Sequence, residues 1–268
     1  MNLFDSAFLC LDIGSTGVRG MAHRVRGAKI VKSAISTSDC FDTVFALRYV
    51  IDDLEHQIGT SFDTAYITGN FGTSIFEMTA KSTAWGGEHK ITTADVRAQI
   101  AQINAPDGYF PMHIVPLRYD TPTARNMISP IGYTDRQLIS AFGSIFYTKS
   151  RLNEVLGFLR RAHITPCAFY DPQFLLNTTL RQKKQTVMFI DLGGEFSSAS
   201  IWTDRGPVWH YKIPLGGTKI TNDISAKLHI GFDDAERIKR AVASFIPKEM
   251  DRFTTRRTDA HGTNFLHT

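Results

Sequence analysis

The sequence predicts an α/β protein with two lobes, and two similar motifs far apart in the chain carry this prediction. The first reads Asp12-Ile-Gly-Ser-Thr-Gly and the second reads Asp191-Leu-Gly-Gly-Glu-Phe. Each follows an apolar run of strand type, Phe8 to Leu11 and Val187 to Ile190, and so places an aspartate before a glycine turn. One copy alone would indicate an ordinary turn, because Gly and Asp both favour turns. The pair indicates a phosphate clamp, in which the N–H groups of the turns face an anion and the aspartates hold Mg²⁺ through water.

The first lobe is predicted to open with short strands and one helix. Phe8 to Ala22 has the pattern of two hairpin strands around the first glycine turn, and Lys29 to Ser36 that of a third strand. From Thr43 to Ile58 apolar residues recur at helical spacing, and Gly59 follows as a stop signal. A further strand is expected at Ala65 to Thr68.

The middle of the chain, about residues 81–148, is predicted to form a small α+β unit of its own. Ile91 to Ile103 has the pattern of a helix that opens with a Thr-x-x-Asp capping box. Strands are expected at His113 to Leu117 and at Leu138 to Thr148. The region therefore combines a helix with strands and stands as a candidate third unit.

After this unit the chain is predicted to return to the first lobe. Arg151 to Ala162 predicts a helix. The segments His163 to Pro166 and Tyr170 to Pro172 predict turns. Phe174 to Leu180 predicts a second helix, which leads to the second lobe near Thr186.

The second lobe continues with a hairpin and two helices. Ser197 to Thr203 and Pro207 to Ile213 form the expected hairpin through an Asp-Arg-Gly turn. Gly216-Gly217 then precedes one helix, and Asp233 to Phe245 predicts another. Glycines at a helix start either admit an anionic ligand to the N-terminal amides or only allow close strand-to-helix packing, and both interpretations stay open.

The motifs of the second lobe resemble those of the actin-like ATPases and, more narrowly, those of the FtsA family of bacterial cell-division proteins. After the Asp191 turn come Ile213-Pro-Leu-Gly-Gly-Thr-Lys-Ile-Thr-Asn-Asp-Ile and Asp234-Ala-Glu-Arg-Ile-Lys, in the order typical of that family. Three segments of the middle unit resemble the SHS2-like domain that the family inserts into its first lobe. They begin at Ile91, His113 and Pro130.

The resemblance implies an actin-like, that is ribonuclease H-like, α/β fold with an α+β insert and an incomplete second lobe. The first lobe would comprise residues 1–80 and 149–185, and the inserted domain residues 81–148. Residues 186–268 would form the partial second lobe.

The resemblance also implies site residues for ATP and Mg²⁺. Asp12 and Asp191 would hold the metal and serve the catalytic step. Gln173 is the candidate that orients a water molecule, with a plain surface position as the alternative. Glu236 and Lys239 match the helix positions that reach the nucleoside in the family, although their spacing also fits a solvated ion pair. The phosphates would be bound by the turns and their neighbours: Gly14, Ser15, Thr16, Gly17, Arg19, Gly193, Gly194, Gly216 and Gly217.

Several positions depart from the family pattern. Glu195 and Phe196 stand where the family has Gly and Thr, and a carboxylate there repels a polyphosphate unless it turns outward or binds the metal. Gly17 stands where a lysine is common, and Arg19, on the same strand face, can supply the charge. Few residues follow the Lys239 helix, so we expect the family's adenine loop to be absent, and ATP turnover is left open.

Composition excludes several other classes of function. The 268 residues are 43% hydrophobic and 21% charged, and the net charge of +4 is scattered, so no nucleic-acid partner is expected. The three cysteines are widely spaced and suit a reducing cytoplasm. No apolar run approaches the roughly 18 residues of a membrane span. Residues 252–268 show no apolar helical period, so we expect peripheral membrane contact only through an anchor beyond this chain.

The function that the resemblance implies is an ATP-binding scaffold of cell division. Such a protein polymerises into filaments and links the FtsZ ring to the cytoplasmic face of the inner membrane at the division site. Two alternatives remain: an interaction module that needs no nucleotide, and a pilus-assembly protein of the PilM type. A sugar- or acetate-kinase type is the least favoured class, because no catalytic base can be assigned for it.

Overall fold

The structure is a computed structural model in which the chain falls into two units, residues 1–218 and 219–268. It describes residues 5–40, 42–180, 186–242, 255–258 and 264–267. Three sheets belong to the described part of the first unit. They are called here the first sheet (β3-β2-β1-β4-β8), the middle sheet (β5-β7-β6) and the third sheet (β11-β10-β9).

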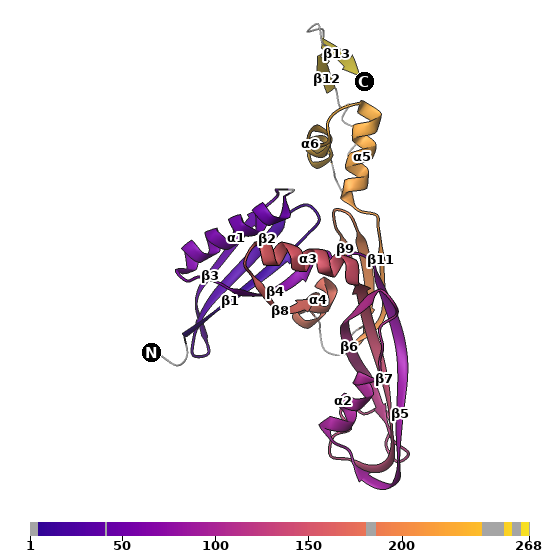
Figure 1. Ribbon diagram of the computed structural model, residues 1–268. Helices are drawn as coiled ribbons and strands as arrows, with labels where there is room; N and C mark the ends of the chain where they lie inside the picture. The colour runs from indigo at the N-terminus through magenta and orange to yellow at the C-terminus, as the bar shows by residue number, and fades with distance from the viewer. Residues whose placement is uncertain (1–4, 41, 181–185, 243–254, 259–263, 268) are drawn as a thin grey trace. The chain divides into compact units, whose positions relative to one another are not determined.

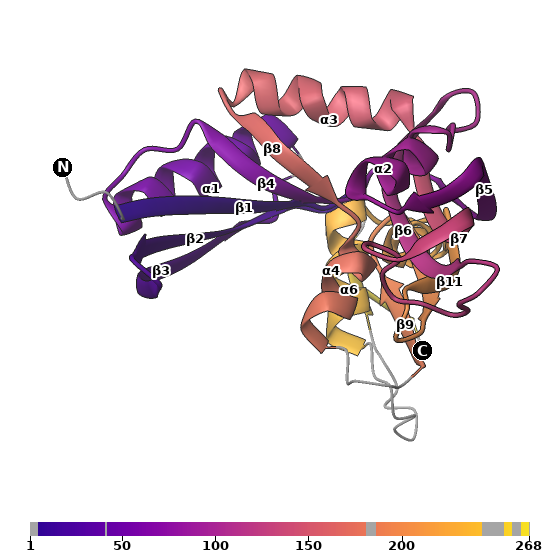
Figure 2. The same cartoon turned by 90° about the horizontal axis from the view of Figure 1, so that it is seen from below.

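The first sheet combines an antiparallel and a parallel half (Figures 1 and 2). β1 (Asp5–Ile13) pairs antiparallel with β2 (Val18–Arg26), which pairs with β3 (Lys29–Ser38). On its other side β1 pairs in parallel with β4 (Thr64–Gly69), and β4 pairs in parallel with β8 (Thr165–Tyr170). The carboxyl ends of β1, β4 and β8 therefore lie at one edge of the sheet.

Two helices cover one face of the first sheet (Figure 2). α1 (Thr43–Ile58) and α3 (Lys149–Arg161) pack on the face to which β1 turns Leu9, Leu11 and Ile13, all fully buried. The Asp42 carboxylate begins α1 by accepting the N–H groups of the helix's first turn, and Gly59 ends it in the left-handed region. The predicted hairpin, third strand, α1 helix and fourth strand are confirmed.

The middle sheet carries the helix that the sequence predicts for this region. β5 (Ser74–Lys90) and β6 (Tyr109–Asp120) flank β7 (Thr134–Thr148), and all pairs are antiparallel. α2 (Thr93–Ala101) packs on the sheet and opens with the expected capping box of Thr92 and Asp95. β5 was not predicted, because from Thr79 onward it alternates half-buried and exposed residues, many of them polar, and so contains no apolar run.

The third sheet follows a short helix, α4 (Pro172–Leu180). Its strands β9 (Val187–Leu192), β10 (Ser197–Trp202) and β11 (Pro207–Ile213) form an antiparallel meander, which confirms the predicted hairpin. Phe189 and Trp202 are buried in the same hydrophobic cluster as the inner face of the first sheet. This shared core fixes the third sheet relative to the first.

One expected turn is partly wrong. Residues 163–166 do not all form a turn, because Thr165 and Pro166 already belong to β8. Pro166 is tolerated there because β8 is an edge strand, where a missing N–H costs no ladder bond. The α3 and α4 helices on either side of β8 agree with the prediction.

The remaining elements lie at and beyond the boundary between the units. α5 (Gly217–Leu228) begins there, and α6 (Phe232–Val242) follows, so Phe245 of the predicted last helix lies outside the described residues. β12 (Thr255–Thr258) pairs with β13 (Asn264–His267), and the rest of residues 252–268 is not described. Within the described residues, no helix is both long and apolar enough to cross a membrane.

Candidate functional site

The two glycine turns have the same backbone form. Asp12 is the penultimate residue of β1, and the N–H of Gly14 donates to the carbonyl oxygen of Gly17 at 3.0 Å. Asp191 is likewise the penultimate residue of β9, and the N–H of Gly193 donates to the carbonyl oxygen of Phe196 at 3.0 Å. The sequence similarity of the two motifs therefore corresponds to two equivalent strand-turn-strand structures.

The two turns meet at their tips. The backbone N–H of Glu195 donates to the Ser15 hydroxyl oxygen at 3.0 Å. A Cβ atom on Gly194 would lie 2.5 Å from Cγ2 of Thr16 and 2.7 Å from Oγ of Ser15, so only glycine permits this approach. The prediction that the two motifs fold back to face each other is thus confirmed.

Both turns line one pocket of about 580 Å³, a size that falls within the roughly 300–1,000 Å³ of small-molecule sites. Its walls come from the polar edge of the first sheet, the third sheet and the α4 residues Leu175 and Leu176. Eight of the predicted site residues line it: Asp12, Gly14, Ser15, Thr16, Arg19, Asp191, Gly193 and Gly194. A pocket with two polar turns and one apolar wall suits a ligand with an anionic end and an apolar body.

The charge of Asp191 is affected by the groups around it in this pocket. Partial burial raises the pKa of Asp191; Lys212 opposes this shift, and the neighbouring carboxylates Asp12 and Asp171 add to it. Arg19 donates to Asp12 across 3.4 Å, but this pair is largely exposed and contributes little. The pocket is therefore lined by two carboxylates, Asp12 and Asp191, whose repulsion a divalent cation would relieve.

These carboxylates fit a hydrated magnesium ion rather than a protein cage. No group of three or more Asp, Glu, His or Cys side chains that could hold a metal occurs in the described part of the chain. Mg²⁺ needs only one or two carboxylates when water and phosphate oxygens complete its shell. Asp12 and Asp191 match that requirement.

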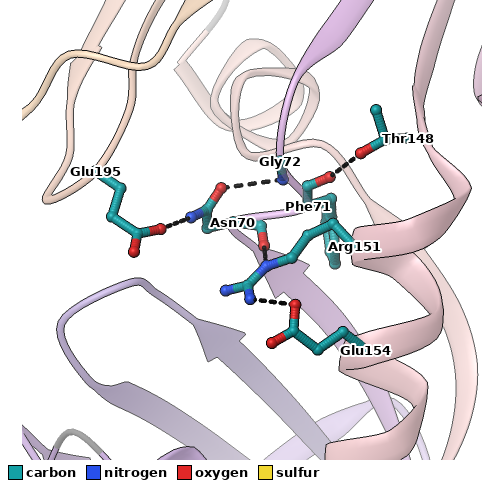
Figure 3. A network of polar contacts seen from close by, with 7 residues as sticks. All are labelled: Asn70, Phe71, Gly72, Thr148, Arg151, Glu154 and Glu195. Atoms are coloured by element: carbon teal, nitrogen blue, oxygen red, sulfur yellow. Dashed lines mark hydrogen bonds and ion pairs between the residues drawn. The ribbon is translucent and has the colours of Figure 1, made fainter.

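Glu195, which departs from the family pattern, is not among the residues that line the pocket, and its side chain points to Asn70 (Figure 3). Its carboxylate accepts a hydrogen bond of 3.0 Å from the side-chain amide of Asn70, which follows β4. Asn70 is itself held in place, because its Oδ1 accepts the N–H of Gly72 and its carbonyl oxygen accepts from Arg151. The carboxylate of Glu195 is thus bound by Asn70, and whether a polyphosphate tolerates it stays a prediction.

Phe196, the other departure, forms part of the pocket wall. The Nζ atom of Lys212 lies 4.9 Å from the centre of its ring and 5.1 Å from that of Tyr147. Distances below about 6 Å allow a cation–π attraction. At the position where the family has a small hydrogen-bond donor, this chain therefore has an aromatic ring that contacts the Lys212 ammonium.

The first turn has no room for the lysine that is common in the family. A Cβ atom on Gly17 would overlap the carbonyl oxygen of Ser38 at the end of β3. Gly17 therefore packs against β3 and is not among the residues that line the pocket. Arg19 lines it instead, as predicted.

Gln173 is buried rather than on the surface. Its side-chain amide donates to the hydroxyl of Ser198, a pocket residue on β10, at 2.9 Å. Its carbonyl oxygen is buried and has no hydrogen-bond partner among the described residues. Gln173 thus lies behind the pocket wall, and the prediction that it orients water is untested.

Gly216 and Gly217 support the second turn from behind. The N–H groups of Gly217 and Thr218 donate to the carbonyl oxygens of Gly193 and Gly194 at 2.9 and 2.8 Å. A Cβ atom on Gly216 would overlap the Gly194 carbonyl. These contacts agree with the close-packing interpretation, and neither glycine is among the residues that line the pocket. Their contact with a ligand stays a prediction.

Glu236 and Lys239 form a pair in the second unit. Their charged groups are 2.6 Å apart on α6, both side chains are mostly buried, and the Thr221 hydroxyl of α5 bonds to each. Burial of Glu236 opposes ionisation, but bonds from Lys239, Thr221 and Arg240 outweigh it and lower the pKa to about 2. The pair joins two helices and is less solvated than an isolated intrahelical pair. Nucleoside binding by it remains a prediction.

Asp171 is a buried residue next to the pocket-lining Tyr147 and Pro172, and the sequence analysis missed it. It is buried at the carboxyl end of β8, accepts the Tyr147 hydroxyl at 2.5 Å and caps α4 by accepting the Phe174 N–H at 2.9 Å. Asn70 was missed as well, at the end of β4. The signal was available, since Asp12 lies near the end of β1 and a polar residue follows each of the parallel strands β4 and β8, at the sheet edge where α/β proteins bind ligands.

Lys212 is the third missed residue. It lies within β11, which the sequence correctly predicts as a strand, and it lines the pocket. Burial lowers the pKa of its ammonium to about 8, although Asp171 and Asp191 oppose the shift. Nothing in a single strand distinguishes an inward lysine from a solvated one, so this residue required the structure.

Comparison with known proteins agrees with these features. The sequence model of the family "Cell division protein FtsA" matches residues 188–264. The cell division protein FtsA of Neisseria meningitidis is 26% identical over 209 residues, which cover 74% of this chain and 49% of that protein. The cell division protein FtsA of Bacillus subtilis is 24% identical over 212 residues, which cover 76% and 48%. The chain therefore spans about half the length of the curated relatives it matches.

A solved structure shows the same fold. The chain resembles a chain of the PilM-PilN type IV pilus biogenesis complex with a TM-score of 0.58 and 15% identity, over 87% of this chain and 69% of that one. At this identity the similarity concerns the fold alone. The actin-like α/β fold predicted from the sequence is confirmed, and the sequence is FtsA-like.

Proposed function

We propose that this FtsA-like chain binds ATP with Mg²⁺ between its two glycine turns and acts in cell division as a nucleotide-controlled scaffold of the actin family. The observation that carries the proposal is the position of Asp12 and Asp191. They end equivalent strands of different sheets, and both line one pocket beneath turns that touch. Such a pair of turns offers N–H groups to phosphate and carboxylates to a metal.

Magnesium would supply the charge that the pocket needs. When bound, it would neutralise the facing aspartates and the phosphate oxygens together. Asp12 and Asp191 would hold it, largely through water, while Ser15 and the turn amides remain close to the phosphates. The apolar α4 residues Leu175 and Leu176 would exclude water from the other side.

The cellular part of the proposal rests on sequence similarity to cell division proteins. In line with the family resemblance, we propose self-association into filaments, contact with the tubulin-like protein FtsZ and action at the inner face of the membrane. Sedimentation of the purified chain with and without FtsZ and ATP tests these contacts. A pilus-assembly function has only the fold similarity in its support.

Binding of ATP with Mg²⁺ is expected to raise the melting temperature of the protein by about 5–10 °C at a ligand concentration 100 times Kd. A ligand at that ratio adds about 2.7 kcal/mol to the native state, and each kcal/mol corresponds to about 2–4 °C for a chain of this size. Asp12→Ala is expected to remove the rise, because it deletes a metal-holding carboxylate. Differential scanning fluorimetry with and without Mg²⁺ measures the effect.

Asp52→Ala is the matched control, since Asp52 is an exposed carboxylate on α1 outside the pocket. It should keep the full rise. An unchanged melting curve of the wild-type protein at saturating ATP and Mg²⁺ would argue for the nucleotide-independent module instead.

A further inference from the structure

Lys212 belongs to a row of polar residues that crosses the third sheet. In the strand register Asp191 lies opposite Ser198, and Ser198 lies opposite Lys212. Cross-strand neighbours point to the same face of a sheet, and all three residues line the pocket. Lys212 is therefore on the same wall as Asp191, and their Cα atoms are about 10 Å apart at the spacing of two strand intervals.

The side chain of Lys212 is held in a defined position. Its ammonium lies 4.9 Å from the centre of the Phe196 ring and 5.1 Å from that of Tyr147, and it donates to Oδ1 of Asn70 at 3.3 Å. Asn70 in turn is fixed by its backbone N–H, which donates to the Ile13 carbonyl of β1 at 2.8 Å. The ammonium is thus positioned by both halves of the pocket.

This ammonium keeps donor capacity for a ligand. Lysine has three N–H donors, and within the described residues no carboxylate oxygen lies within 4.0 Å of Nζ. Several charged and titratable groups face it at longer range. They are Asp171 before α4, Asp191 on β9, Glu195 in the second turn, Arg151 on α3, Tyr147 on β7 and His210 on β11.

We propose that Lys212 of β11 binds the phosphate groups of the ligand in this pocket, next to the altered second turn. The proposal rests on the proposed function and adds a phosphate-contacting residue to it. Asn70 contacts both charged groups: its amide N–H group donates to Glu195, and its oxygen accepts from Lys212. The Glu195 carboxylate is thereby occupied by a hydrogen bond, and the Lys212 ammonium lines the pocket as a cation for the phosphates.

A lysine that served structure alone would only offset the charge of Asp171 and Asp191. Substitution of such a residue would change the melting temperature of the protein. It would not weaken the binding of ATP and of the phosphate chain alone by the same factor. The experiment therefore compares ATP with inorganic tripolyphosphate, which has no nucleoside. Both probes are titrated calorimetrically in the presence of Mg²⁺.

Lys212→Gln is expected to weaken binding of ATP and of tripolyphosphate by the same factor, at least about tenfold, because it removes a charge-assisted hydrogen bond. Lys212→Arg keeps the charge and is expected to bind ATP within about threefold of the wild type at pH 7. Lys32→Gln, an exposed lysine on β3, is the control and should leave both affinities unchanged.

The pH dependence gives a second readout. Because burial holds the pKa of Lys212 near 8, the wild type should lose affinity between pH 7.5 and 9.5, whereas Lys212→Arg should keep it. Affinities of Lys212→Gln within twofold of the wild type would overturn the proposal while leaving the proposed function intact. If the wild type binds neither ATP nor tripolyphosphate, both this proposal and the proposed function are overturned.

Discussion

Asp171→Ala is expected to lower the free energy of unfolding by about 2–4 kcal/mol. The carboxylate of Asp171 caps α4 through the Phe174 N–H, and loss of such a cap costs about 1 kcal/mol. Its other oxygen accepts the hydroxyl of Tyr147, which is fully buried, and a buried donor left without its acceptor costs about 1–3 kcal/mol more. Urea unfolding followed by circular dichroism measures the change.

A second N-cap provides the matched control. Asp42 caps α1 with the same chemistry, but it is exposed and has no buried hydroxyl partner. Asp42→Ala should therefore cost only about 1 kcal/mol. If Asp171→Ala lowers the free energy of unfolding no more than Asp42→Ala does, the hydrogen bond between Asp171 and Tyr147 does not stabilise the protein. A double-mutant cycle with Tyr147→Phe isolates the coupling of the two side chains.

Acidification is expected to remove about 3 kcal/mol of stability through His113. Its Nε2 accepts the backbone N–H of Asp171 at 3.0 Å, and its ring stacks on Phe174, so the neutral imidazole is the form that fits. Burial lowers its pKa from 6.5 to about 4, with Asp171 opposing and His210 supporting the shift. Between pH 6.5 and 4 the unfolded chain therefore binds more protons than the folded protein does. Stability is therefore fully present above pH 6.5 and is lost as the pH falls toward 4.

His113→Gln tests this prediction, because the amide oxygen can accept the same N–H but does not titrate. The free energy of unfolding should depend less on pH in the variant than in the wild type between pH 6.5 and 4. His56→Gln, which changes an exposed histidine of α1, should follow the wild-type curve. Parallel curves for wild type and His113→Gln would show that His113 titrates normally.

Local patterns were sufficient to predict the elements that hold the aspartates. The apolar strands before Asp12 and Asp191, the glycine turns and the α1 stripe all depend on neighbouring residues, and the structure confirms them. That the two turns face each other was inferred from the pair of motifs and supported by the family resemblance, because neither motif alone states which strands share a pocket.

The missed residues depend on contacts between distant segments. Asn70 contacts the second turn through its bond to the Glu195 carboxylate, 125 positions later in the chain. Lys212 faces the pocket because of the register of β11 on β10, which follows from pairing rather than from composition. Asp171 becomes buried only when β8 joins β4 and Tyr147 of the middle sheet packs against it.

The most direct test of the account is a crystal structure of the protein with ATP and Mn²⁺ in place of Mg²⁺, with data collected at the manganese absorption edge. The account predicts one anomalous peak between the carboxylates of Asp12 and Asp191, with the triphosphate beneath the two glycine turns and the Lys212 ammonium on a phosphate oxygen. A metal and nucleotide bound elsewhere, with both carboxylates free of them, would contradict it.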